Sequence, residues 1–226
     1  MGGMINMKLN SLEDLYFLAR EKLINEKGNI TISIAGIPKI SKSNDIIGNC
    51  VQEWIPQWLE DNGLDLTANP GTQAFPDFTA TFDDQEYDME VKCWNYNNPP
   101  AFDIANFDGF YREIYENPRK LNAQYLIFGY VPTKHGFEIA DIYLKNIWDI
   151  TYPPARSKYP LGLQVKQGRS YAIRPSAFHK NPENRFASIR EFVEAIRDTR
   201  KMYPLDGMVE PDEWFERVSS GFVAGE

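Results

Sequence analysis

Two carboxylates and one lysine have the residue types and spacing of a metal-dependent hydrolytic site. Glu90 and Lys92 lie two residues apart, and Asp77 follows a proline earlier in the chain. Residues i and i+2 of a β-strand point to the same face, so Glu90 and Lys92 are expected side by side. A turn at 83–85 joins the two segments and brings Asp77 back beside them. The sequence therefore predicts that two acidic groups and one ammonium group converge.

Such a cluster predicts a divalent cation and hydrolytic chemistry. Carboxylates that lie close together resist ionising unless a counter-charge is present. Mg²⁺ supplies that charge and binds through one or two carboxylates together with waters and substrate phosphates. A bound metal lowers the pKa of water and neutralises charge on a phosphate in the transition state. Lys92 would orient or deprotonate the attacking water, or stabilise the additional charge on phosphorus.

A simpler explanation is an exposed hairpin on which Glu90 and Lys92 form a weak surface ion pair. The opposite face of the second segment carries apolar or aromatic residues at every second position. That pattern places the hairpin in a core sheet. Charges that converge on a core sheet are typical of functional sites, so the pattern favours the metal site over the surface pair.

The periodicity of the sequence predicts the α/β class, with a mixed central β-sheet flanked by helices. A nearly continuous apolar run at 123–131 is typical of a strand buried on both faces. No repeat or long linker divides the chain, so we expect a single domain over 1–226. The predicted strands are 30–35, 77–82, 86–94, 123–131, 137–143, 161–165 and 170–173, and the predicted helices are 12–25, 44–62, 104–116, 188–202 and 211–218.

The predicted helix 44–62 precedes the charged hairpin and carries a broad apolar stripe that would pack on the core. Trp54 and Trp58 belong to this stripe and are expected in the core. Glu53 is placed at the edge of the stripe, near the seam between the helix and the element it covers. Pro56 is expected to kink or interrupt the helix.

The chain resembles the PD-(D/E)-x-K nuclease superfamily, and most of all its type II restriction endonucleases, over residues 43–143. The resemblance rests on Pro76-Asp77, Glu90-Val91-Lys92-Cys93-Trp94 and Pro100-Ala101-Phe102-Asp103-Ile104-Ala105-Asn106-Phe107. It implies a restriction-endonuclease-like α/β/α core and Mg²⁺-dependent hydrolysis of phosphodiester bonds in double-stranded DNA that leaves a 5′-phosphate. It also implies, for many members, a homodimer on a short palindromic sequence.

The resemblance gives individual residues a role. Asp77 and Glu90 match the metal ligands of the family, and the carbonyl of Val91 is a further candidate ligand. Lys92 matches the lysine of the motif. A carboxylate from the preceding helix joins the site in many such enzymes, and Glu53 is the matching candidate.

Charge is unevenly distributed along the chain. The formal net charge of −8 by itself argues against a nucleic-acid partner, but residues 156–201 carry 11 Lys/Arg and only 4 Asp/Glu. DNA is a polyanion that such a basic segment would attract, and a set of solvated surface charges is the alternative. Asn residues that follow the charged strand would also reach DNA, although they form turns equally well. The candidate DNA-binding residues are Arg156, Lys158, Lys166, Arg169, Arg174, Asn95 and Asn97.

Other functions have less support in the sequence. The two cysteines and two histidines have no partners at the spacing of a zinc site or of a Ser–His hydrolase. No long apolar run and no signal peptide are visible, so we expect a cytoplasmic protein. Two alternatives to a restriction enzyme stay open: a structure-specific repair or mobile-element nuclease of the same fold, and a non-catalytic DNA-binding module.

Overall fold

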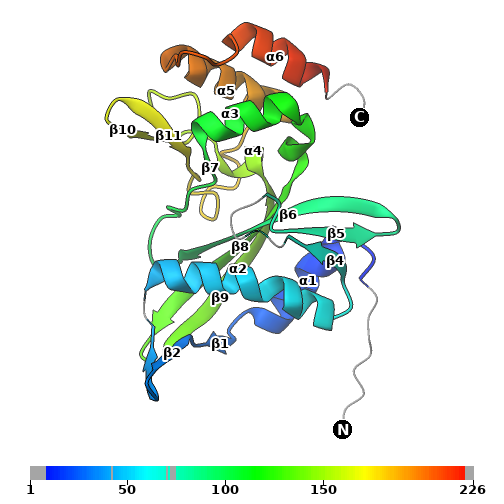
Figure 1. Ribbon diagram of the computed structural model, residues 1–226, viewed down its shortest axis with the longest axis vertical. Coiled ribbons are helices and arrows are strands. Elements are labelled where there is room, and N and C mark those ends of the chain that lie inside the picture. Colours follow the sequence, from blue (N-terminus) through cyan, green and yellow to red (C-terminus); the bar gives the residue numbers. More distant parts are fainter. Residues whose placement is uncertain (1–8, 42, 70, 72–74, 222–226) are drawn as a thin grey trace. The chain divides into compact units, whose positions relative to one another are not determined.

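The computed structural model describes residues 9–41, 43–69, 71 and 75–221, which fold into two compact units. The first unit comprises residues 1–99 and 123–145, and the second comprises residues 100–122 and 146–226 (Figure 1). Among the described residues, no helix combines the length and the apolar character needed to cross a membrane.

A six-stranded mixed sheet forms the centre of the first unit and confirms the predicted α/β architecture. The strand order is β1 (Lys27–Gly28), β9 (Gly136–Asn146), β8 (Gln124–Thr133), β6 (Gln85–Asn95), β5 (Phe78–Phe82) and β4 (Asp65–Ala68). Strands β6 and β8 run parallel, while β4 with β5, β5 with β6, and β1 with β9 run antiparallel.

The β5–β6 hairpin follows the predicted geometry. Phe82 pairs with Gln85, so the turn between the strands consists of Asp83 and Asp84 alone. Both residues have positive φ, 46° and 65°, which Asp tolerates better than most residues and which matches the twist of a two-residue hairpin. The turn sets the register of the two strands, and the register places Asp77 level with the middle of β6.

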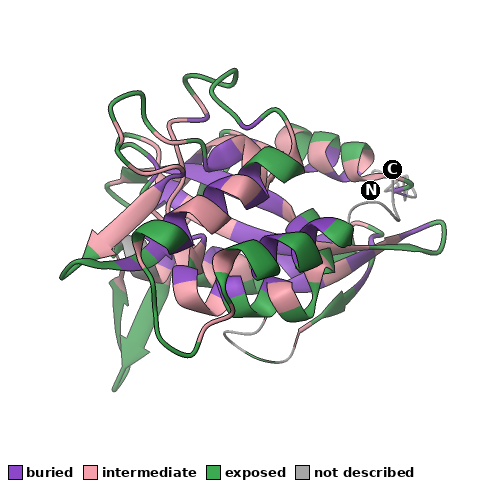
Figure 2. Ribbon diagram, turned by 90° about the horizontal axis from the view of Figure 1, so that it is seen from above, coloured by how far each residue is buried: buried purple, intermediate pink, exposed green. Residues whose placement is uncertain are grey.

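The helices carry buried residues on one side and exposed residues on the other (Figure 2), and two helices of the first unit bury one side in its core. Helix α1 (Leu12–Leu23) begins at Ser11, whose hydroxyl accepts a hydrogen bond from the Asp14 N–H. Helix α2 (Asn44–Asp61) packs against β6 and contains Pro56 without interruption. Trp54 is 48% exposed, so its predicted place in the core is wrong; its ring contacts that of Trp58, which is partly buried.

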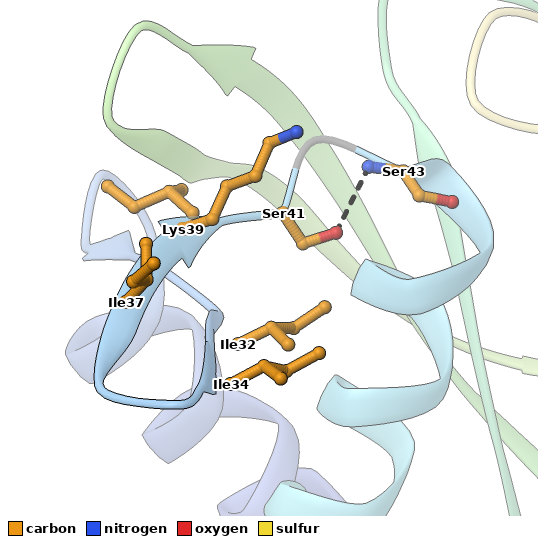
Figure 3. A pocket seen from close by; sticks show the side chains of 7 residues that line it. Ile32, Ile34, Ile37, Lys39, Ser41 and Ser43 are labelled. Atoms are coloured by element: carbon orange, nitrogen blue, oxygen red, sulfur yellow. Dashed lines mark hydrogen bonds between the residues drawn. The ribbon is translucent and has the colours of Figure 1, made fainter.

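A small hairpin of β2 (Thr31–Ile34) and β3 (Ile37–Ile40) forms a sheet of its own. Ile34 and Ile37 are each 74% exposed, and with Ile32 they line a hollow of about 750 Å³ (Figure 3). Only β2 was expected from the sequence. Strand β3 is exposed along nearly its whole length, so it lacks the alternation that marks a half-buried strand.

The second unit combines a three-stranded sheet with helices. The sheet order is β10 (Leu163–Lys166), β11 (Arg169–Ile173) and β7 (Ala105–Asn106). The helices are α3 (Phe107–Glu116), the 3₁₀ helix η1 (Pro118–Asn122), α4 (Ile147–Ile150), α5 (Ile189–Met202) and α6 (Pro211–Ser220).

Helix α3 begins three residues later than the sequence predicted. The predicted helix began at residue 104, but residues 105–106 are extended and pair with β11. Asn106 is the cap, and its side chain accepts a hydrogen bond from the N–H of Gly109 at 2.9 Å. Pairing with a strand more than sixty residues away thus overrides the local helix signal.

Candidate active site

Asp77 is held at the start of β5 by both its backbone and its carboxylate. Its N–H donates to the carbonyl of Met89 on β6 at 3.0 Å. Oδ2 accepts a 2.6 Å hydrogen bond from the N–H of Val91, and Oδ1 accepts one from the side-chain amide of Gln52 on α2. Because each oxygen has a donor, the plane of this carboxylate is fixed relative to β6 and α2.

Glu90 and Lys92 form a buried ion pair on β6. Nζ of Lys92 lies 2.9 Å from Oε2 of Glu90, and the two side chains are 17% and 9% exposed. Burial by itself lowers the pKa of the Lys92 ammonium, but the charge and hydrogen bond of Glu90 and the charge of Asp77 outweigh it. The pKa of Lys92 is therefore raised above its ordinary value. This geometry differs from the exposed surface pair considered as the simpler explanation.

The neighbouring strand supplies a tyrosine to the same cluster. Tyr125 on β8 is the register partner of Glu90 and is only 3% exposed. Burial raises the pKa of its phenol well above the ordinary value, and the charges of Glu90 and Asp77 raise it further. Both carboxylates thus act on one buried hydroxyl group. Asp77, Glu90 and Lys92, predicted to converge, are brought together in the structure.

The cluster has the donor set of a site for a hard divalent cation. It holds two carboxylates against one ammonium group, and the hydrogen-bond donors to Asp77 are neutral. Within the described part of the chain, no group of three or more His, Cys, Asp or Glu residues is placed to hold a metal. Two carboxylates with completing waters suit Mg²⁺, which binds few protein ligands. The residues present therefore fit a cation of this kind.

Helix α2 brings Gln52, not Glu53, to Asp77. Gln52 is partly buried and bonded to the carboxylate, whereas Glu53 is exposed. The sequence contained a signal for this. Successive helical residues are about 100° apart, so with Val51 and Ile55 buried, Gln52 lies next to the buried face and Glu53 lies opposite it. Placing Glu53 at the edge of the apolar stripe was therefore an error of helical geometry.

The predicted basic residues of the second unit lie mostly on its surface. Arg156, Lys158, Lys166 and Arg169 are all exposed. The β10–β11 hairpin presents the last two of these on either side of its turn, where Gln167 and Gly168 have positive φ. Nζ of Lys166 lies 3.4 Å from the centre of the Tyr171 ring, an exposed aromatic side chain. This hairpin therefore offers cations and an aromatic face to solvent.

Arg174 is arranged differently from the other basic residues. Its guanidinium pairs with Asp103 at 2.8 Å and donates to the side chain of Gln164, also at 2.8 Å. It also donates to the carbonyl of Ala101. These contacts tie the start of the 100–122 segment to the β10–β11 hairpin. The contacts of Arg174 therefore indicate a structural role within the second unit.

The two Asn candidates lie where β6 ends. Oδ1 of Asn95 accepts a hydrogen bond from the N–H of Asn97 at 3.1 Å, as in an Asx turn. Asn97 is exposed. Asn95 therefore shapes the turn, and Asn97 is the one of the two that faces solvent.

Comparison with known proteins identifies the family. A family model described as NgoBV restriction endonuclease matches residues 10–224. The chain is 35% identical over 187 residues to a type II restriction enzyme, NlaIV, of Neisseria lactamica, which covers 80% of this chain and 76% of that protein. It is 30% identical over 159 residues to the type II restriction enzyme NgoBV of Neisseria gonorrhoeae, covering 70% and 88% of the two chains.

The fold agrees with the sequence comparison. The solved structure of NlaIV restriction endonuclease superposes with a TM-score of 0.79 at 31% identity, and the match covers 96% of this chain and 91% of the other. The family match extends over almost all of the chain, well beyond the motif from which the resemblance was first inferred. The chain therefore belongs to the NgoBV restriction endonuclease family and is a type II restriction endonuclease of the PD-(D/E)-x-K superfamily.

Proposed function

We propose that the chain is a Mg²⁺-dependent endonuclease that hydrolyses phosphodiester bonds of double-stranded DNA at a short specific sequence. Family membership supports the restriction class. The observation that carries the metal and the mechanism is the convergence of Asp77, Glu90 and Lys92 in the first unit. In this function residues 1–226 act as a single nuclease domain of a cytoplasmic protein.

Each residue of the cluster has a distinct part in the proposed reaction. Asp77 and Glu90 would hold Mg²⁺, with the carbonyl of Val91 as a third protein ligand. When bound, the cation supplies charge neutralisation at the phosphate and an activated water. Lys92, whose pKa is raised beside Glu90, is protonated and acts by donating hydrogen bonds to the attacking water or to a phosphate oxygen.

Binding of DNA is assigned to exposed residues of the second unit. Arg156, Lys158, Lys166 and Arg169 are proposed to contact mainly phosphates, with one or two residues reading bases. A hairpin is an element that enters a major groove, so β10–β11 is the part proposed to read sequence. We further propose that the enzyme acts as a homodimer, for which light scattering would give about twice the 26.1 kDa of one chain.

A plasmid digest tests the proposed function. Wild-type protein with Mg²⁺ should give discrete DNA fragments, and chelation of the cation should abolish them. A smear, or nicking only at branched or mismatched DNA, would instead indicate a structure-specific nuclease. Binding without cutting under every divalent cation would indicate a non-catalytic module.

A further inference from the structure

We infer that Gln52 is a positioning residue that orients Asp77 for the cation and sets the charge of the site. The inference rests on the proposed metal-dependent function and adds a residue to it. Gln52 is the only α2 residue within the described part of the chain with a side-chain hydrogen bond to Asp77. Its amide donates to Oδ1, while the Val91 N–H donates to Oδ2.

The two donors leave the carboxylate usable by a cation. A carboxylate oxygen has two lone-pair directions, so one hydrogen bond at each oxygen leaves one direction free. Rotation of the Asp77 carboxylate would break both bonds at once. Helix α2 is itself anchored, because Val51, Ile55 and Leu59 are buried in the core of the first unit. A fixed helix thus holds the amide, and the amide holds the metal ligand.

The neutrality of Gln52 matters as much as its hydrogen bond. With Asp77, Glu90 and Lys92 charged, the cluster has a net charge of −1. A glutamate at position 52 would set a third negative charge directly against Asp77 and repel it. An amide in this place therefore supports a site for one divalent cation, whereas an acid would favour tighter binding or a second cation.

Cation binding to the DNA-free protein tests the inference without relying on cleavage. Calorimetric titration with MgCl₂ should show binding to Gln52→Ala weakened about 10-fold, the usual effect of losing a partner of a metal ligand. The kcat of this variant should be lower than that of the wild type and should recover partly at high Mg²⁺. Its KM for DNA should be unchanged. Gln57→Ala is the matched control, because Gln57 is an exposed glutamine of the same helix whose side-chain amide donates to Asp61; this variant should match the wild type.

The variant Gln52→Glu keeps the size of the side chain and provides a second test, which can be used if Gln52→Ala does not fold. Its melting temperature should lie below that of the wild type without divalent cation, and should rise more than that of the wild type when MgCl₂ is added. A merely structural role for Gln52 would give the same rise in both proteins. The inference would be overturned if Gln52→Ala bound Mg²⁺ as tightly as the wild type. It would also be overturned if MgCl₂ raised the melting temperatures of Gln52→Glu and wild type equally. Either result would leave the proposed function standing. A wild type that neither binds Mg²⁺ nor cuts DNA would overturn both.

Discussion

The two units use charge in opposite ways. The first has 9 Lys/Arg and 17 Asp/Glu, so it carries the whole net charge of the chain, whereas the second has 15 of each. Yet the acidic unit buries Lys92 beside Glu90, and the neutral unit exposes Lys166 and Arg169 at the turn of a hairpin. Net charge therefore does not locate function in this protein. In the proposed function, the buried and convergent charges form the reactive site, and the exposed charges form the DNA-binding surface.

Burial of charge alone does not make a reactive site, as Arg200 of the second unit shows. Arg200 is 2% exposed, pairs with Asp108 at 2.5 Å and donates to the carbonyl of Tyr203. Its guanidinium also lies 4.8 and 4.7 Å from the ring centres of Phe107 and Tyr111. One cation meets one carboxylate here, and the pair holds α5 to α3. The Glu90–Lys92 pair differs because a second carboxylate lies beside it.

The largest expected effect comes from removing a member of the reactive cluster. Asp77→Ala and Lys92→Ala should each lower the cleavage rate by about 10³-fold or more, because each removes a charged group from the reaction centre. Circular dichroism and DNA binding in the presence of Ca²⁺ should stay close to those of the wild type. Cleavage at the wild-type rate by either variant would show that the chemistry lies elsewhere.

Removing a partner of the structural pair should affect stability instead. Asp108→Ala leaves the buried Arg200 guanidinium without its carboxylate, and we expect a loss of about 3 kcal/mol in the free energy of unfolding. Asp212→Ala is the control, since Asp212 is exposed and pairs with a half-exposed lysine, so its loss should be near zero. Urea denaturation measures both values. Equal stability of the two variants would contradict the structural role given to Arg200.

Substitutions of two arginines in the basic segment should distinguish a DNA-binding role from a structural role. Arg169→Ala should weaken DNA binding several-fold and lower the slope of log K against log salt by about 1, because the variant loses the phosphate contact proposed for this exposed residue. Arg174→Ala should mainly lower stability, because its guanidinium is bonded to Asp103 and Gln164. The sequence alone placed both residues among the DNA-binding candidates. An unchanged salt slope in Arg169→Ala would mean that the hairpin does not face DNA.

The parts of the fold that sequence could predict are those fixed by local chemistry. The β5–β6 hairpin follows from alternation and an Asp-Asp turn, and the starts of α1 and α5 follow from Ser caps. The convergence of Glu90 and Lys92 follows from the two-residue period of a strand. Each of these signals lies within a few residues of the feature it determines.

The parts that sequence missed depend on distant partners. The start of α3 is set by pairing of β7 with β11, and the burial of Tyr125 beside Glu90 is set by the parallel register of β6 and β8. The sequence analysis named Glu53 where the structure has Gln52, and this error has a different cause. One residue along a helix turns the side chain by about 100°, so a small error in the position of the apolar stripe changes which residue reaches the site.

The most direct test of the central claim is a crystal of the DNA-free protein soaked in MnCl₂ and measured for anomalous scattering. Mn²⁺ prefers the same oxygen ligands as Mg²⁺ and is visible by its own signal. We predict a peak within bonding distance of carboxylate oxygens of both Asp77 and Glu90. Strong peaks elsewhere on the chain with none at these two residues would contradict the account.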